Sequence, residues 1–96
     1  MLRSAAAQAV ASLKVLANED RLLLLCQLSQ GEMCVSELEE RLDIAQPTLS
    51  QQLGVLRNEG AVTTRREGKN VYYSFDDPAL LSVIAVLYGL YCPIGA

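Results

Sequence analysis

The feature that most constrains the fold is a change of hydrophobic period within residues 46–75. In the first half of this stretch, Leu49, Leu53 and Leu56 fall on one side of a helix, which predicts a helix with one apolar face. In the second half, polar and apolar residues alternate on both sides of a Gly-Lys-Asn turn, which predicts a β-hairpin. We therefore expect a small domain in which a hairpin directly follows a helix.

Three further helices are expected before this stretch. The first lies within residues 1–17 and carries an apolar stripe rich in alanine, which lets another helix approach closely. The second begins after Asn18, a good N-cap residue, and ends near Gly31. Because this second helix is apolar all round, we expect it to be central and buried. A short third helix covers the sequence CVSELEERLD.

A last helix is expected after the hairpin. Asp76 or Asp77 is suited to cap its start, and Pro78 fits its first turn, where a missing N–H is not needed. Apolar residues then continue to Cys92, and Pro93 is expected to stop the helix.

This order of elements is that of a winged helix-turn-helix. We expect one mainly α domain over residues 1–96, with the helix-turn-helix in 35–59 and the wing in 61–75. Helices in 1–17 and 77–92 flank it, and the high apolar fraction of the chain (51%) leaves an apolar face for a partner subunit. The sequence therefore predicts a homodimer formed through the first and last helices.

The absence of histidine argues against most catalytic and metal-binding arrangements. The chain has neither the commonest general base nor the commonest neutral metal ligand, and it has no Gly-rich phosphate loop and no CxxC motif. We therefore expect no enzyme activity, no metal site and no cofactor. Three cysteines do not suggest a secreted disulfide framework, and no apolar run is long enough to cross a bilayer. These features predict a cytoplasmic protein with no membrane partner.

Charge is distributed unevenly along the chain. The formal net charge is −3, which by itself argues weakly against nucleic-acid binding. Residues 46–75, however, hold four basic and two acidic side chains, a local charge of +2, whereas the remainder holds four basic and nine acidic ones. The positive charge therefore lies on the predicted helix and hairpin, which points to double-stranded DNA as a partner.

The outward face of the helix in this stretch is polar, almost uncharged and built from short side chains. Glutamine can pair with adenine through two hydrogen bonds, and serine or threonine can reach base edges or phosphates. In the hairpin, two adjacent arginines lie on opposite faces of one strand, so at most one points directly at a groove, and a lysine lies at the tip. The predicted DNA contacts are Gln46, Pro47, Thr48, Ser50, Gln51, Gln52, Arg57, Arg65, Arg66 and Lys69.

Three segments carry a family resemblance. The stretches LKVLANEDRLLLLCQLSQGE, CVSELEERLDIAQPTLSQQLGVLRNEG and VTTRREGKNVYYSF resemble the ArsR/SmtB family of dimeric winged-helix repressors. The resemblance runs from about Leu13 to Pro93, and within the family it is closest to the group of BigR, SqrR, YgaV and HlyU. It implies a dimeric regulator that binds an imperfect inverted repeat. One departure is Ala45, where the family often has a capping serine.

The resemblance also changes the interpretation of two cysteines. From the residues alone, Cys26 is typical of a buried apolar position, and Cys92 lies at an accessible helix end. The resemblance implies that they form a redox-sensing pair, in which persulfides create a sulfur bridge that lowers DNA affinity. A direct disulfide needs Cα atoms within about 7 Å, and each added sulfur lengthens the bridge by about 2 Å. A slightly wider pair would accept a polysulfide and resist a disulfide.

Other interpretations remain open at this point. The sequence EMCVSEL resembles the metalloid-binding box of arsenic-sensing relatives, but Ser36 stands where a second thiolate is needed, so Cys34 is expected to be a helix-cap or surface thiol. The chain is alternatively a regulator that responds to a metalloid, a metal or peroxide, a regulator without a sensing function, or a module that binds another protein. Regulation by displacing another repressor is also compatible with the resemblance.

Overall fold

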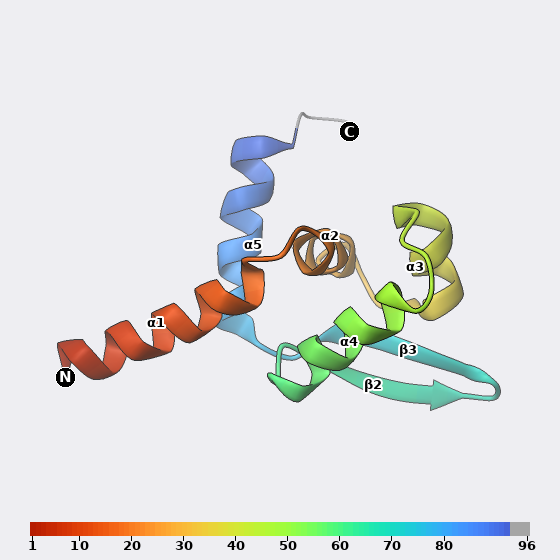
Figure 1. Cartoon of the computed structure of the whole chain (residues 1–96), viewed down its shortest axis with the longest axis horizontal. Coiled ribbons are helices and arrows are strands. Elements are labelled where there is room, and N and C mark those ends of the chain that lie inside the picture. The colour runs from red at the N-terminus through yellow and green to blue at the C-terminus, as the bar shows by residue number, and fades with distance from the viewer. Residues whose placement is uncertain (93–96) are drawn as a thin grey trace.

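The computed structural model describes residues 1–92, and within them the chain forms five helices and a three-stranded sheet (Figure 1). The helices are α1 (Leu2–Leu16), α2 (Glu19–Leu28), α3 (Val35–Leu42), α4 (Thr48–Asn58) and α5 (Pro78–Tyr91). The strands are β1 (Met33–Cys34), β2 (Val62–Glu67) and β3 (Asn70–Phe75). This order confirms the predicted winged helix-turn-helix. Pro93, the expected stop for the last helix, lies outside the described residues.

Helix α2 lies at the centre of the molecule, where it contacts α1, α3, α4, α5 and β3 (Figure 1). Leu24, Leu25 and Leu28 are buried in the core, as their central position requires. The expectation that α2 is buried all round is wrong, however, because Leu23 is 40% exposed and Cys26 is half-buried. The helix turns by about 100° per residue, so one side of it faces away from its packed neighbours.

Short local signals explain where the helices begin. The Asn18 side chain accepts a hydrogen bond from the backbone N–H of Arg21, and the Asp77 carboxylate accepts from those of Ala79 and Leu80. Asp77 is therefore the cap of α5, and Pro78 is its first residue, as predicted.

The hydrophobic core includes the inner face of α4. Leu49, Leu53 and Leu56 are all buried, which confirms the predicted inner face of this helix. The full core comprises Val15, Leu16, Leu24, Leu25, Leu28, Met33, Leu38, Ile44, Leu49, Leu53, Leu56, Ala61, Val62, Leu80 and Ile84.

The predicted hairpin is formed by β2 and β3, which pair antiparallel from Val62 opposite Phe75 to Glu67 opposite Asn70. Gly68 closes the turn with φ +63°, a left-handed conformation that glycine adopts at little cost. Strand β3 also pairs with β1 on its other edge, so the order of the sheet is β1-β3-β2. The two-residue strand β1 was not predicted, because two residues are too few to show an alternating pattern.

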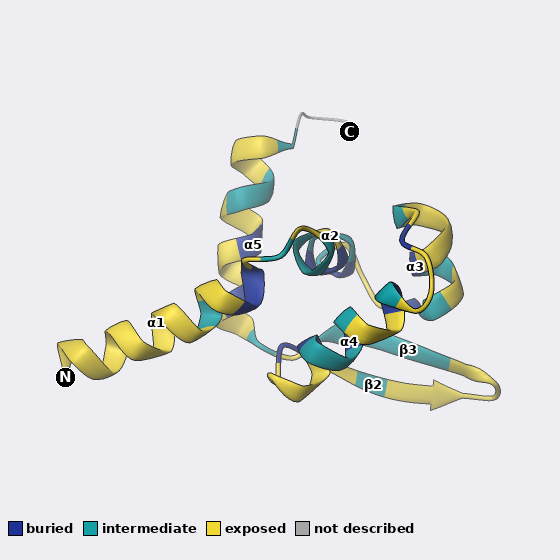
Figure 2. Ribbon diagram, viewed as in Figure 1, coloured by how far each residue is buried: buried dark blue, intermediate teal, exposed yellow. Residues whose placement is uncertain are grey.

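Helices α1 and α5 project from the body of the molecule and are its most exposed elements (Figure 2). Only Val15 and Leu16 of α1, and Leu80 and Ile84 of α5, are buried. Large apolar side chains on both helices remain exposed: Leu2, Val10, Leu13, Leu81, Val83, Val86, Leu90 and Tyr91. Within residues 1–92, no helix has both the length and the apolar character needed to span a bilayer.

Candidate functional site

The outer face of α4 presents the polar side chains that were predicted to contact DNA. They are exposed or half-buried: Gln46, Pro47, Thr48, Ser50, Gln51, Gln52 and, at the far end, Arg57. The Ser50 hydroxyl donates a hydrogen bond to Oε1 of Gln46, so these two side chains form one polar surface. No side chain caps the start of α4, where the N-cap residue is Pro47 and not Ala45. Backbone N–H groups at such an end can bind a DNA phosphate.

Arg21 at the start of α2 links α4 to the end of α1 through hydrogen bonds, a role that no sequence pattern predicted. Its guanidinium donates to the backbone oxygens of Val15 (2.7 Å) and Lys14 (3.0 Å) at the end of α1. A further N–H donates to Oε1 of Gln52 on α4, at 3.0 Å. A bidentate contact to adenine uses both the oxygen and the nitrogen of a glutamine side-chain amide. Because the Gln52 oxygen already accepts a hydrogen bond from Arg21, Gln51 is better placed for that contact than Gln52. Arg21 therefore joins α1, α2 and α4 at one point.

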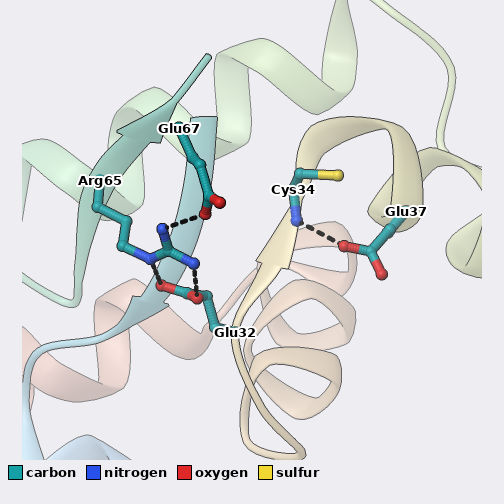
Figure 3. A network of polar contacts seen from close by, with 5 residues as sticks. All are labelled: Glu32, Cys34, Glu37, Arg65 and Glu67. Carbon is teal, nitrogen blue, oxygen red and sulfur yellow. Dashed lines mark hydrogen bonds and ion pairs between the residues drawn. The ribbon is translucent and has the colours of Figure 1, made fainter. Parts of the chain in front are cut away.

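The wing carries three cationic side chains, and they differ in their surroundings. Arg65 on β2 forms a bidentate ion pair with Glu32, with both N–O distances 2.7 Å, and pairs with Glu67 at 2.7 Å (Figure 3). Its guanidinium also lies 4.6 Å from the centre of the Tyr72 ring. The hydrogen bonds that Arg65 donates to Glu32 and Glu67 raise the pKa of Arg65, and the Arg65 guanidinium in turn lowers the pKa of Glu32. The charge of Arg65 is thus balanced within the protein.

Arg66 and Lys69 are exposed, and neither forms an ion pair with any residue between 1 and 92. Arg66 pairs with Val71 in the hairpin register, one position beyond the pair of Arg65 with Tyr72. Successive side chains of a strand point to opposite faces, so Arg65 and Arg66 do not share a surface. The wing charges available to a phosphate are therefore those of Arg66 and Lys69.

Cys26 and Cys92 line the same cavity, although 65 residues separate them in the sequence. Cys26 lies on α2, and Cys92 caps the end of α5, where its N–H donates to the oxygen of Tyr88. Both are free thiols and both are half-buried. This cavity, which we call the thiol cavity, has a volume of about 460 Å³ and is lined by Leu23, Cys26, Gln27, Gln30, Arg41, Leu42, Tyr88 and Cys92.

Burial, and then the negative charge of Cys92, raises the pKa of the Cys26 thiol. Cys26 is thus mainly protonated at neutral pH, and its nucleophilicity is limited because the thiolate is the reactive form. The cavity therefore brings two free thiols, from α2 and from the end of α5, to one site.

Cys34 does not line the thiol cavity. Its N–H donates to Oε1 of Glu37 at 3.1 Å (Figure 3). Its Sγ lies 3.2 Å from the Ser36 hydroxyl. Hydrogen bonds with Cys34 lower the pKa of the Glu37 carboxylate. Cys34 is the N-cap of α3, which is one of the two roles expected for it. It is not a surface thiol, the other expected role, because it is buried in β1, where it pairs with Tyr72 of β3. No three Cys, Asp or Glu side chains among residues 1–92 are grouped so that they could hold a metal ion.

Comparisons with known proteins identify the family. A sequence model described as "Bacterial regulatory protein, arsR family" matches residues 18–64, which run from the cap of α2 into β2. The biofilm growth-associated repressor of Agrobacterium fabrum is 54% identical over 80 residues, which are 83% of this chain and 68% of that protein. The chain belongs to the ArsR family.

Solved structures agree with this assignment to the ArsR family. The transcriptional repressor BigR from Xylella fastidiosa is 41% identical and superposes with a TM-score of 0.90, over 96% of this chain and 94% of that one. Reduced HlyU from Vibrio cholerae is also 41% identical, with a TM-score of 0.92 over 96% and 97% of the two chains. As an ArsR-family member the chain is a DNA-binding regulator and not an enzyme, as the sequence predicted.

Proposed function

We propose that this protein is a cytoplasmic, homodimeric repressor that binds an inverted-repeat operator through α4 and the wing. A sulfur bridge between Cys26 and Cys92, formed by persulfides or polysulfides, releases it from DNA. The observation that carries the proposal is the placement of both thiols on one cavity between α2 and α5. We favour repression over activation because the relative from Agrobacterium fabrum is named biofilm growth-associated repressor. A relative from Vibrio cholerae, 44% identical, is named transcriptional activator HlyU.

The DNA-binding part of the proposal rests on exposed side chains of α4 and of the wing. The polar face of α4 fits the major groove, where Ser50 and Gln51 meet base edges. Arg66 and Lys69 of the wing are exposed for the neighbouring phosphates. A two-fold dimer presents this surface twice, and so it matches an inverted repeat.

The sulfur chemistry follows from the two thiols and an external donor. Each cysteine thiolate attacks the outer sulfur of a low-molecular-weight persulfide, the S–S bond of the donor breaks, and the donor leaves as a thiol. The resulting Cys92 persulfide anion then attacks the inner sulfur of the Cys26 persulfide. A trisulfide forms and hydrosulfide leaves, so one donor sulfur is retained in the bridge and the other is reduced. The raised pKa of Cys26 limits its thiolate form, and the sequence therefore begins at Cys92, at the end of α5.

A bridge at this position can change DNA affinity because α2 contacts both α5 and α4. Joining Cys26 to Cys92 fixes the end of α5 against α2, and a dimer formed through α5 then adopts a different spacing of its two α4 helices. The bridge alters DNA binding only to the extent that it favours one dimer geometry over the other. A coupling of this kind is worth about 1–3 kcal/mol, or roughly 5- to 150-fold in affinity.

A DNA titration tests the proposal. The protein, reduced or treated with glutathione persulfide, is titrated against a fluorescent duplex from the DNA upstream of its own gene. We expect treatment to weaken binding by roughly 5- to 150-fold, and dithiothreitol to restore it. Cys26→Ser and Cys92→Ser should bind equally well before and after treatment, whereas Cys34→Ser should respond like the wild type.

Two outcomes would reject the proposed switch. The first is an affinity that does not change on treatment of the wild type. The second is an equal loss of affinity in Cys26→Ser. A parallel sample treated with hydrogen peroxide shows whether a direct disulfide has the same effect as a longer bridge.

A further inference from the structure

The thiol cavity contains a positive charge that the sulfur chemistry above does not use. Among the described residues that line it, Arg41 is the charged side chain, and it comes from α3, whereas the thiols come from α2 and α5. Gln27 and Gln30 line the same cavity, and glutamine side chains can donate hydrogen bonds. Two free thiols thus share a cavity with one arginine and two glutamines.

The charge of Arg41 is available to a ligand. Its side chain is exposed, and within residues 1–92 it forms no ion pair. The carboxylate whose pKa it lowers is that of Glu37, one helical turn earlier. That carboxylate accepts the N–H of Cys34 at the other end of α3 and is therefore oriented toward the helix start. Arg41 is thus an unpaired cation among the described residues that line the cavity.

We propose that the thiol cavity is a binding site for anionic sulfur donors and that Arg41 is the residue that recognises their charge. This inference rests on the proposed function and names the class of reagent that it uses: a persulfide or polysulfide carrying carboxylate or sulfide charges. The cavity volume of about 460 Å³ accommodates a ligand of that size. A guanidinium binds a carboxylate through two parallel hydrogen bonds and also attracts a compact anion.

The position of Arg41 also favours the transfer step itself. When a cysteine thiolate attacks the outer sulfur of the donor, the S–S bond breaks and the electron pair leaves with the inner sulfur as a thiolate. This leaving thiolate is negatively charged until it takes up a proton from water. A guanidinium in the same cavity stabilises that developing charge, so removing it should slow the reaction of anionic donors.

The test compares donors that differ in charge. Glutathione persulfide and inorganic polysulfide are anionic, whereas the persulfide of cysteamine carries an ammonium group and no carboxylate, so it lacks a net negative charge. The rate of sulfur addition to the intact protein is followed by mass spectrometry for the wild type, Arg41→Gln and Arg41→Lys. Arg3→Gln removes the same charge from the exposed start of α1, away from the cavity, and is the matched control.

We expect Arg41→Gln to slow both anionic donors by about tenfold, the lower end of electrostatic steering effects. The cysteamine persulfide should react at least as fast with Arg41→Gln as with the wild type, Arg41→Lys should retain most of the anionic rate, and Arg3→Gln should match the wild type. Added salt should reduce the advantage of the wild type. Equal melting temperatures, and equal DNA affinity before treatment, would show that Arg41→Gln is folded.

Equal slowing of all three donors, or no slowing of the anionic ones, overturns the role of Arg41. If the wild type links Cys26 to Cys92 normally in that experiment, the proposed function survives and only this inference fails. If no donor links Cys26 to Cys92 in the wild type, both fail together.

Discussion

Arg65 and Arg66 are neighbours on β2, yet their electrostatic surroundings are opposite. Arg65 is held by Glu32 and Glu67 and lies over the ring of Tyr72, whereas Arg66 is exposed and forms no ion pair with residues 1–92. A cation already balanced by two carboxylates releases few counterions when DNA approaches. We therefore interpret Arg65 as a residue that ties β2 to the loop before β1, and Arg66 as a phosphate contact.

Salt dependence distinguishes these two roles. For Arg66→Gln, the negative slope of log affinity against log salt should become less steep by about 0.9 for each DNA phosphate that the protein no longer neutralises. For Arg65→Gln the slope should stay near the wild-type value, because its charge is paired inside the protein. The measurement is a DNA titration at several salt concentrations. An equal change of slope in both variants would contradict this interpretation and show that Arg65 leaves its carboxylates when DNA binds.

Residue-level features could be predicted from the sequence where their partners are close along the chain. The caps Asn18 and Asp77 act within three residues, so a short pattern reveals them. The Arg65–Glu32 pair spans 33 residues and the Arg21–Gln52 bond spans 31, so their geometry depends on the completed fold. For this reason the sequence indicated Arg65 and Gln52 only as candidate DNA contacts and did not show their internal partners.

At the level of elements, α1 and α5 have apolar faces that the described chain does not cover. Leu13 is 58% exposed, and it lines an apolar cavity of about 370 Å³ that also includes Val83 of α5. Val86 and Leu90 continue the exposed face along α5, at 61% and 68% exposure. A contiguous apolar face of this kind marks an interaction surface. One structural neighbour, from Mycobacterium bovis, is described as homodimeric.

Leu13→Glu should therefore convert the proposed homodimer to a monomer. Burying a leucine is worth about 2 kcal/mol, and a two-fold interface loses it twice, so the dissociation constant should rise by roughly a thousandfold. Sedimentation velocity across a range of protein concentrations measures the change. Thr63→Glu adds the same charge on the wing and should remain dimeric. Identical behaviour of the two variants would contradict dimerisation through α1.

Elements with a clear period or a cap could be predicted from the sequence, and the others could not. The leucine spacing in α4 and the Gly-Lys turn of the wing each determine one element almost alone. Strand β1 depends instead on β3, which offers its free edge to Met33 and Cys34. The exposed side of α2 was missed for a related reason, since composition alone does not show which neighbours a helix lacks.

For the whole molecule, α2 connects the thiol cavity to the DNA-binding surface. It carries Cys26, which lines the thiol cavity together with Cys92 at the end of α5, and it packs against α4 through the core. Arg21 at its start adds a hydrogen bond to Gln52 on α4. Under the proposed function, we therefore expect a change in how α5 lies against α2 to reach α4, the proposed DNA-binding helix. The sequence suggested this cysteine pair only through family resemblance, because no local pattern places residues 26 and 92 on one cavity.

The most direct test of the account is the intact mass of the protein after reaction with glutathione persulfide, followed by peptide mapping. The account predicts a species that has lost two hydrogens and gained at least one sulfur, with the peptide containing Cys26 joined to the one containing Cys92, and no such species in Cys26→Ser. An unchanged mass, or a bridge that involves Cys34 in place of either residue, would contradict it.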